Sequence, residues 1–166
     1  MTSSRLSRIV LAGAAVALSG LLLAPGAEAQ TVKQAAQAKP AKASAEATHK
    51  VAIQVNQNDK AVMDLALNNA KNVIDYYKEK GETVAIEIVT YGPGLHMLRA
   101  DTSPVKDRIA PMSLENPNLK FIACGNTQAN QAKAKPVTLI SEAKLMPSGV
   151  VRLMELQKQG YAYIRP

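Results

Sequence analysis

Apolar and polar positions follow two different periods along this chain, and the change of period predicts strands and helices. Three short runs rich in β-branched residues predict strands at 50–56, 84–91 and 119–124. Between the first two, apolar residues recur at helical spacing from a cap at Asn58 or Asp59 to Gly81. The side chains expected on the apolar face of this helix are Val62, Met63, Leu65, Ala66, Leu67, Ala70, Val73, Ile74 and Tyr76.

The second half of the chain continues the alternation of strands and helices. Gly92-Pro93-Gly94 turns the chain into a helical region that runs toward Pro117 and is broken at Pro104. A short polar helix at 126–133, a brief strand at 143–146, a helix from Ser148 to Gln159 and a last strand at 161–164 follow, with Val150, Leu153 and Met154 expected to point inward. This alternation predicts a layered α/β fold with a largely parallel, five-stranded sheet.

In such a sheet the loops that follow the strands lie along one edge, where α/β proteins place their chemistry. Three of these loops carry polar residues, at 56–58, 91–96 and 124–127. Cys124 ends the third strand, and Gly125-Asn126-Thr127 opens the next helix, so backbone amides from Asn126 onward are expected to face the sulfur and favour the thiolate.

The first 29 residues have the features of a cleaved signal peptide. Arg5 and Arg8 precede an apolar stretch at 9–23, and Ala27-Glu28-Ala29 matches a cleavage site, which predicts a periplasmic protein that begins at Gln30. The alternative is a membrane anchor, but the apolar stretch is shorter than the roughly 20 residues that a spanning helix needs. We therefore expect no stable membrane insertion.

Residues 30–48 are rich in Ala, Lys and Gln and contain Pro40, which predicts a flexible tether, the alternative being a short Ala-rich helix. The remaining residues, 49–166, suffice for one domain with a single core. The chain carries a net charge of +7 but no basic stripe interleaved with aromatic residues, so a nucleic-acid partner is not expected. One cysteine and two widely spaced histidines form no metal-ligand or heme-attachment pattern, so neither a metal nor a cofactor is expected.

An exported chain with one cysteine cannot form an internal disulfide. Cys124 is therefore a buried small apolar residue, one half of an intermolecular bridge, or a reactive thiol. A reactive thiol requires exposure to solvent and a lowered pKa. His96 is expected on the same edge, either as an activating partner of the thiol or as a solvated residue on the first turn of a helix. Gly92-Pro93-Gly94 forms either an anion-binding nest or a tight turn.

Four stretches of the domain resemble the DsrE/DsrF-like family of sulfur metabolism, in its single-domain branch with signal peptides. They are LALNNA at 65–70, VTYGPGL at 89–95, FIACGNT at 121–127, and PSGVV at 147–151 continuing to QGYAYIRP at 159–166. The resemblance implies a three-layer α/β/α domain that assembles into oligomers. In the sulfur-relay members a cysteine after the third strand carries persulfide sulfur, and Cys124 has the matching position. The predicted export, and the absence of a second relay cysteine, are departures from those members.

These observations lead to two hypotheses of different classes. The first is a periplasmic sulfur-handling protein with Cys124 as the catalytic residue, and with His96, Tyr91, Gly125, Asn126 and Asn56 as candidate ligand-binding residues. Its partners would be a sulfur donor or acceptor, which is either a protein or a small thiol. The second is a non-catalytic, oligomeric small-ligand-binding or accessory module in which Cys124 is buried. For either hypothesis the apolar end of the chain at 161–164 predicts a homo-oligomer.

Overall fold

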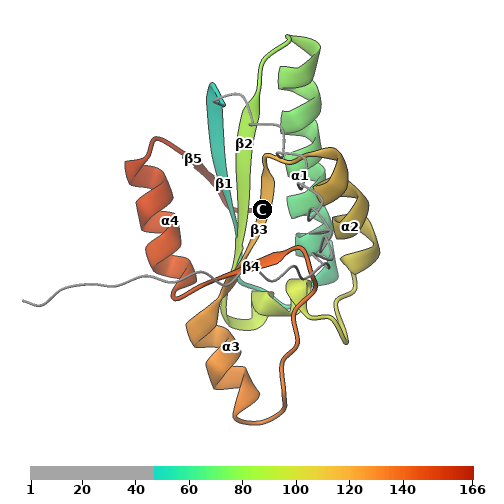
Figure 1. Cartoon of the computed structure of the whole chain (residues 1–166), viewed down its shortest axis with the longest axis vertical. Coiled ribbons are helices and arrows are strands. Elements are labelled where there is room, and N and C mark those ends of the chain that lie inside the picture. Colours follow the sequence, from blue (N-terminus) through green and yellow to red (C-terminus); the bar gives the residue numbers. More distant parts are fainter. Residues whose placement is uncertain (1–46) are drawn as a thin grey trace, which may run out of the picture. The chain divides into compact units, whose positions relative to one another are not determined.

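The computed structural model describes residues 47–166, so the predicted signal peptide and most of the predicted tether lie outside the described residues. Strands and helices alternate through this region (Figure 1). The elements are β1 (His49–Val55), α1 (Lys60–Glu79), β2 (Val84–Thr90), the 3-10 helix η1 (Gly92–Leu98), α2 (Lys106–Glu115), β3 (Leu119–Cys124), α3 (Gly125–Ala132), β4 (Ala143–Met146), α4 (Gly149–Lys158) and β5 (Ala162–Ile164).

The five strands form one sheet in the order β4-β3-β2-β1-β5, and every neighbouring pair is parallel. The register is continuous across the centre, where Ile53 of β1 lies beside Ile88 of β2, and Ile88 lies beside Phe121 of β3. This arrangement confirms the predicted α/β fold with a largely parallel sheet. Because the strands are parallel, all of their carboxyl ends lie at the same edge.

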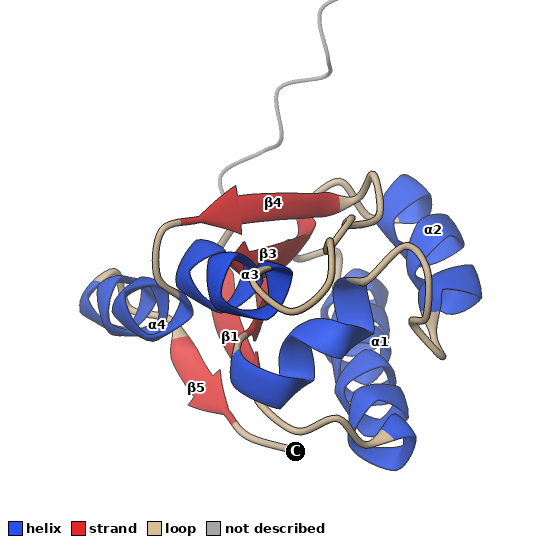
Figure 2. Ribbon diagram, turned by 90° about the horizontal axis from the view of Figure 1, so that it is seen from below, coloured by secondary structure: helices blue, strands red, loops and turns tan. Residues whose placement is uncertain are grey.

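Helices cover both faces of the sheet, which gives three layers (Figures 1 and 2). The main core lies between the sheet and α1, α2 and η1, where Ile53, Leu67 and Phe121 are fully buried. Successive side chains of a strand point to opposite faces, so Ile122 faces the other layer and packs with Leu156 of α4. No helix of the described residues is long and apolar enough to cross a membrane.

The N-caps of α1 and α4 lie where the sequence predicts them, whereas the buried faces of these two helices are narrower than predicted. Asp59 and Ser148 accept hydrogen bonds from the backbone N–H groups of Ala61 and Val151, as N-caps do. Leu65 and Tyr76 were expected on the apolar face of α1, but they are 45% and 53% exposed. On α1 the buried face consists of Met63, Ala66, Leu67 and Ala70, because a cylinder touches a flat sheet along one stripe only.

The same correction applies to α4. Val150 and Met154 were expected to point inward, but they are 49% and 53% exposed. Gly149, Leu153 and Leu156 face the sheet instead. Their spacings of four and three residues select one side of the helix, and Val150 and Met154 lie on the other side.

The helical region predicted between Gly92 and Pro117, with a break at Pro104, forms two helices, η1 and α2, and Pro104 lies between them. Chain reversal near Ala100 separates them, and Ser103 fixes that turn by donating a hydrogen bond to the carbonyl oxygen of Met97. The η1 helix lies directly on β1, because a Cβ atom on Gly94 would come 2.3 Å from the carbonyl oxygen of Val55. No side chain larger than hydrogen fits at Gly94.

A charge pair fastens α4 to the sheet. Glu87 of β2 is 2% exposed, and Arg152 of α4 donates two hydrogen bonds to its carboxylate, of 2.8 and 2.7 Å. Buried carboxylates persist in proteins when they are paired in this way. Glu155 adds a second, more exposed partner for the guanidinium at 3.4 Å.

The corrected orientation of α4 can be tested by two substitutions in one helix. Leu156→Ala removes a fully buried side chain and is expected to lower the free energy of unfolding by about 2–5 kcal/mol. Met154→Ala changes a side chain that is 53% exposed, and we expect an effect within about 0.5 kcal/mol. Urea denaturation of both variants measures the difference. Equal losses would contradict the observed orientation.

Candidate functional site

Cys124 is the last residue of β3 and the N-cap of α3, so its side chain lies beside the first turn of that helix. Its register partner on β4 is Met146, after which the chain turns through Pro147 and Ser148 into α4. The first turns of α3 and α4 therefore meet beside one sulfur atom. Both turns carry backbone N–H groups without partners inside their helices.

Several of these groups act on the sulfur and lower the pKa of the Cys124 thiol. Burial acts in the opposite direction and is the largest single influence, since it disfavours the charged thiolate. The Thr127 hydroxyl and the backbone N–H groups of Gly149, Thr127 and Asn126 together outweigh it. The lowered pKa is the direction that the strand-to-helix position predicted.

The Thr127 hydroxyl is held in the orientation that suits this role. The backbone N–H of Gly92 donates a hydrogen bond of 2.9 Å to the Thr127 hydroxyl oxygen. With the oxygen engaged as an acceptor, the hydroxyl hydrogen is available for the sulfur of Cys124. The loop after β2 thus acts on the thiol through a side chain of α3.

Gly149 brings the amide of α4 close to the thiol because it has no side chain. A Cβ atom on Gly149 would lie 3.2 Å from the Cβ of Cys124 and 3.1 Å from the Cβ of Tyr91. Gly125 is confined in the same manner, since its Cβ would lie 3.2 Å from the carbonyl oxygen of Met146. Larger residues at these two positions would push the helix starts away from Cys124.

The sequence left open whether Cys124 is buried or accessible, and the structure shows that it is buried, with 5% of the residue exposed. Gly149 lies against it, and Tyr91 lies against Gly149. The physical reason is that α4 packs down onto the sheet face from which Cys124 projects, and its first turn covers the sulfur.

The structure brings together four of the six predicted site residues. Cys124, Gly125 and Asn126 are consecutive, and Tyr91 joins them through Gly149. His96 is half-buried in η1, and no hydrogen bond or ion pair among residues 47–166 joins its side chain to Cys124. The Cys124–His96 pair considered from the sequence is therefore not formed.

Asn56 follows β1 at the same edge of the sheet, and β2 separates β1 from the strand of Cys124. Its backbone approaches η1, because a Cβ on Gly94 would lie 2.7 Å from the Cα of Asn56. No hydrogen bond of its side chain is formed within the described residues. Asn56 thus borders η1, and no contact joins it to the thiol.

Two groups that act on Cys124 were not predicted from the sequence. Thr127 was identified only as part of a helix-opening turn, although its position three residues after the cysteine places a hydroxyl on the first turn. Gly149 lies 25 positions along the chain from Cys124, and only the parallel pairing of β3 with β4 brings it close. No pattern in the sequence near Gly149 indicates this contact.

Neither a large cavity nor a cluster of metal-binding side chains is found at Cys124 in the described residues. Within residues 47–166, no three His, Cys, Asp or Glu side chains gather as a metal ion requires. A cavity of about 160 Å³ lies beside α4, lined by Met146, Pro147, Ser148, Val151, Arg152 and Glu155. Larger cavities lie at the opposite edge of the sheet. The distinguishing feature at Cys124 is therefore the set of hydrogen-bond donors around the sulfur.

No known protein-family profile and no curated protein matches the chain. Among solved structures, it is similar to MTH1491 from Methanobacterium thermoautotrophicum, a protein of unknown function. The two are 27% identical, with a TM-score of 0.61, and the alignment covers 71% of this chain and 99% of that chain. The likeness supports the α/β fold.

The contribution of Thr127 to the thiol can be measured directly. Thr127→Val keeps the shape of the side chain and removes its donor, so it is expected to raise the pKa of Cys124. At a fixed pH near neutrality, the fraction of Cys124 that is in the thiolate form then falls. Thr127→Ser retains the hydroxyl and should titrate like the unchanged protein. The ultraviolet absorbance of the thiolate against pH gives both values, and an unchanged titration in Thr127→Val would refute the role of the hydroxyl.

Proposed function

We propose that this chain is a periplasmic sulfur-handling protein that holds sulfane sulfur as a persulfide on Cys124. The observation that carries the proposal is the convergence of four hydrogen-bond donors, from α3 and α4, on this one sulfur. Donors that stabilise a thiolate also stabilise the negative charge of a persulfide. The resemblance of 121–127 to the DsrE/DsrF-like pattern supports the same chemistry.

The proposed step is a thiol exchange on a sulfane-sulfur donor. The Cys124 thiolate attacks the outer sulfur of a donor persulfide, R–S–SH, and a new S–S bond forms on Cys124. The S–S bond of the donor breaks, and the donor leaves as the thiolate R–S⁻. Attack by an acceptor thiolate on the outer sulfur reverses these roles and regenerates the Cys124 thiolate, so the cycle needs no external oxidant or reductant.

The burial of Cys124 bears on which donors can react. Only 5% of the residue is exposed, and the first turn of α4 lies against it. A small linear donor, such as inorganic polysulfide or a low-molecular-weight persulfide, reaches such a thiol more readily than a protein does. We propose donors of this small class.

The exchange is tested by loading the protein with sulfur. Incubation with inorganic polysulfide, followed by intact-protein mass spectrometry, is expected to show the mass of one added sulfur atom. Cys124→Ser and Cys124→Ala should both fail to load while keeping their circular dichroism spectra, because each change is small. Reduction with a thiol should remove the added mass. Loading that persists in both variants would overturn the proposal.

A second candidate function has the burial of Cys124 in its favour. A cysteine that is 5% exposed is typical of a packing residue. The chain would then be a non-catalytic ligand-binding or accessory module. Absence of loading on the unchanged protein, together with alkylation of Cys124 only after unfolding, would favour this function over the first.

We also propose that the protein assembles as a homo-oligomer. Val150, Val151 and Met154, on the outer side of α4, are 49%, 50% and 53% exposed, and exposed apolar groups of this kind are frequent at interfaces. This surface adjoins the turn that covers Cys124. Burial of α4 in an assembly would therefore affect access to the thiol.

Light scattering at micromolar concentration is expected to give a mass that is a multiple of the monomer. Met154→Glu places a charge in the proposed interface and should shift the population toward monomer. Leu114→Glu is the matched control, because Leu114 is 87% exposed but lies on α2. A purely monomeric unchanged protein would contradict the assembly.

A further inference from the structure

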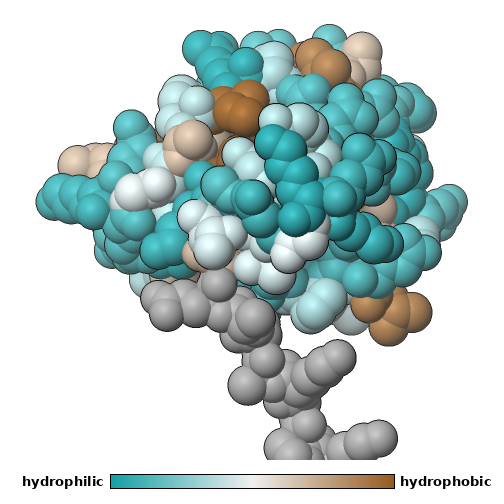
Figure 3. Space-filling view, turned by 90° about the horizontal axis from the view of Figure 1, so that it is seen from above, coloured by the Kyte–Doolittle hydropathy of each residue, from teal (hydrophilic) through white to brown (hydrophobic). Residues whose placement is uncertain are grey.

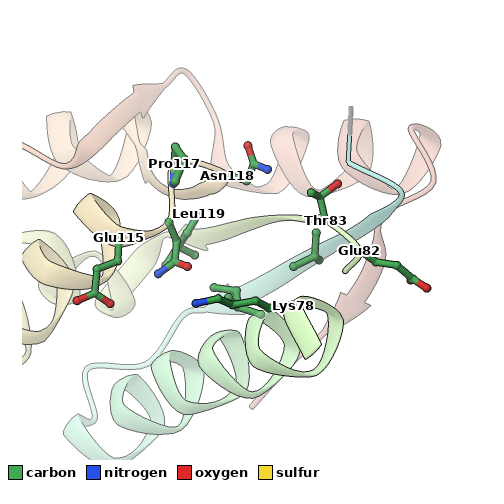
Figure 4. A pocket seen from close by; sticks show the side chains of 10 residues that line it. Lys78, Glu82, Thr83, Glu115, Pro117, Asn118 and Leu119 are labelled. Atoms are coloured by element: carbon green, nitrogen blue, oxygen red, sulfur yellow. The ribbon is translucent and has the colours of Figure 1, made fainter. Parts of the chain in front are cut away.

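The amino edge of the sheet, opposite to Cys124, contains two adjoining cavities. One, of about 210 Å³, lies between the ends of α1 and α2 and the starts of β2 and β3 (Figure 4). A second, of about 430 Å³, adjoins it along the groove between the two helices. Ile74, Lys78, Glu115 and Asn116 line both, so the two form one cleft.

The inner wall of this cleft is apolar. Val84 begins β2 and Leu119 begins β3, and they are 7% and 4% exposed. Ile74 of α1 packs against the same core. Seen from this edge, the surface of the protein is largely hydrophilic, with apolar groups in separate spots (Figure 3). The cleft therefore offers a small apolar interior below a polar rim.

The rim carries two opposite charges that form no direct pair. Within residues 47–166, the side chains of Lys78 and Glu115 make no hydrogen bond or ion pair. Figure 4 shows Lys78 extending from α1 toward the side where Glu115 stands on α2. Lys71 is bound to Asp75 and also attracts the carboxylate of Glu115 without a direct contact.

Glu82, on the far side of the rim, is engaged as well, because it pairs with His49. This pairing leaves Lys78 as the cation and Glu115 as the carboxylate that are available to a bound molecule. Both are exposed, so neither has been desolvated by the fold itself.

The end of α2 and the side chain of Asn116 favour a positive charge on the α2 side of the cleft. Helix α2 ends at Glu115, and the carbonyl end of a helix carries partial negative charge. The Asn116 side-chain amide nitrogen donates a hydrogen bond of 2.9 Å to the carbonyl oxygen of Met112, which leaves its own amide oxygen free to accept. An ammonium group beside Glu115 would meet two kinds of acceptor there.

We infer that this cleft binds a free α-amino acid with an aliphatic side chain. The ammonium group lies beside Glu115 and the Asn116 amide oxygen, and the carboxylate lies beside Lys78. The side chain enters the interior formed by Ile74, Val84 and Leu119. The first cavity, which would take the side chain, has about 210 Å³, less than the roughly 300–1,000 Å³ of drug-sized ligand sites, and this favours a small aliphatic group there.

Titration of the ¹⁵N-labelled full chain with L-leucine tests the inference by nuclear magnetic resonance. Saturable shifts are expected in the amides of 74–84 and 112–119. The analogue 4-methylpentanoate, which lacks the ammonium group, and 3-methylbutylamine, which lacks the carboxylate, should each bind at least about tenfold more weakly. Equal binding of either analogue, or no saturable shift up to millimolar leucine, would overturn the inference.

Substitutions test Lys78 and Glu115 one at a time, and they test whether the cleft is independent of Cys124. Lys78→Gln and Glu115→Gln should each weaken leucine binding about tenfold, whereas Glu79→Gln and Lys106→Gln, which change exposed residues of the same two helices outside the cleft, should not. Unchanged affinity in both cleft variants would refute the assignment. Cys124→Ser should bind leucine normally, because this site does not depend on the sulfur chemistry.

Discussion

The parallel pairing of all five strands determines where charge is stabilised in this protein. The helices α1, α2 and α4 run back along the parallel strands, so they begin at the carboxyl edge of the sheet and end at the amino edge, whereas α3 begins at the carboxyl edge and points away from the sheet (Figure 1). At the carboxyl edge, α3 and α4 begin beside Cys124, and their N–H groups favour an anion. At the amino edge, α1 and α2 end beside the cleft of Lys78 and Glu115, where carbonyl groups favour a cation. One topological constraint therefore gives the two edges opposite preferences.

The position of α4 connects the core with the candidate site. Arg152 lies three residues after Gly149, and its bidentate pairing with the buried Glu87 holds the start of the helix against the sheet. Breaking a buried pair by removing one partner typically costs about 3–5 kcal/mol, because a buried charge is left alone. The same packing presents the Gly149 N–H to the sulfur and covers it. The contribution of Gly149 to the thiolate and the restricted access to the sulfur therefore have one structural cause.

Close contacts at two glycine residues allow the surrounding helices to approach the sheet and Cys124. Gly94 lets η1 lie on the end of β1, where a Cβ atom has no room, and Gly149 lets α4 approach Cys124, where a Cβ atom would be tightly confined. The first contact positions the loop from which Gly92 orients Thr127, and the second supplies a donor directly. Two glycines far apart in the sequence thus serve the same sulfur atom, one through Thr127 and one through its own amide.

The local pattern of residues was sufficient to predict the elements of the fold. β-branched runs marked the central strands, Asp59 and Ser148 marked helix starts, and the alternation of strands and helices implied a parallel sheet, because these signals act within a few residues. The position of Cys124 at a strand end likewise predicted its lowered pKa, since the donors of α3 follow it directly in the chain. The burial of Cys124, the exposure of Met154 and the partner of Glu87 were not predictable in this way. Each depends on how α4 packs against strands that are distant in sequence, and only the tertiary structure specifies that contact.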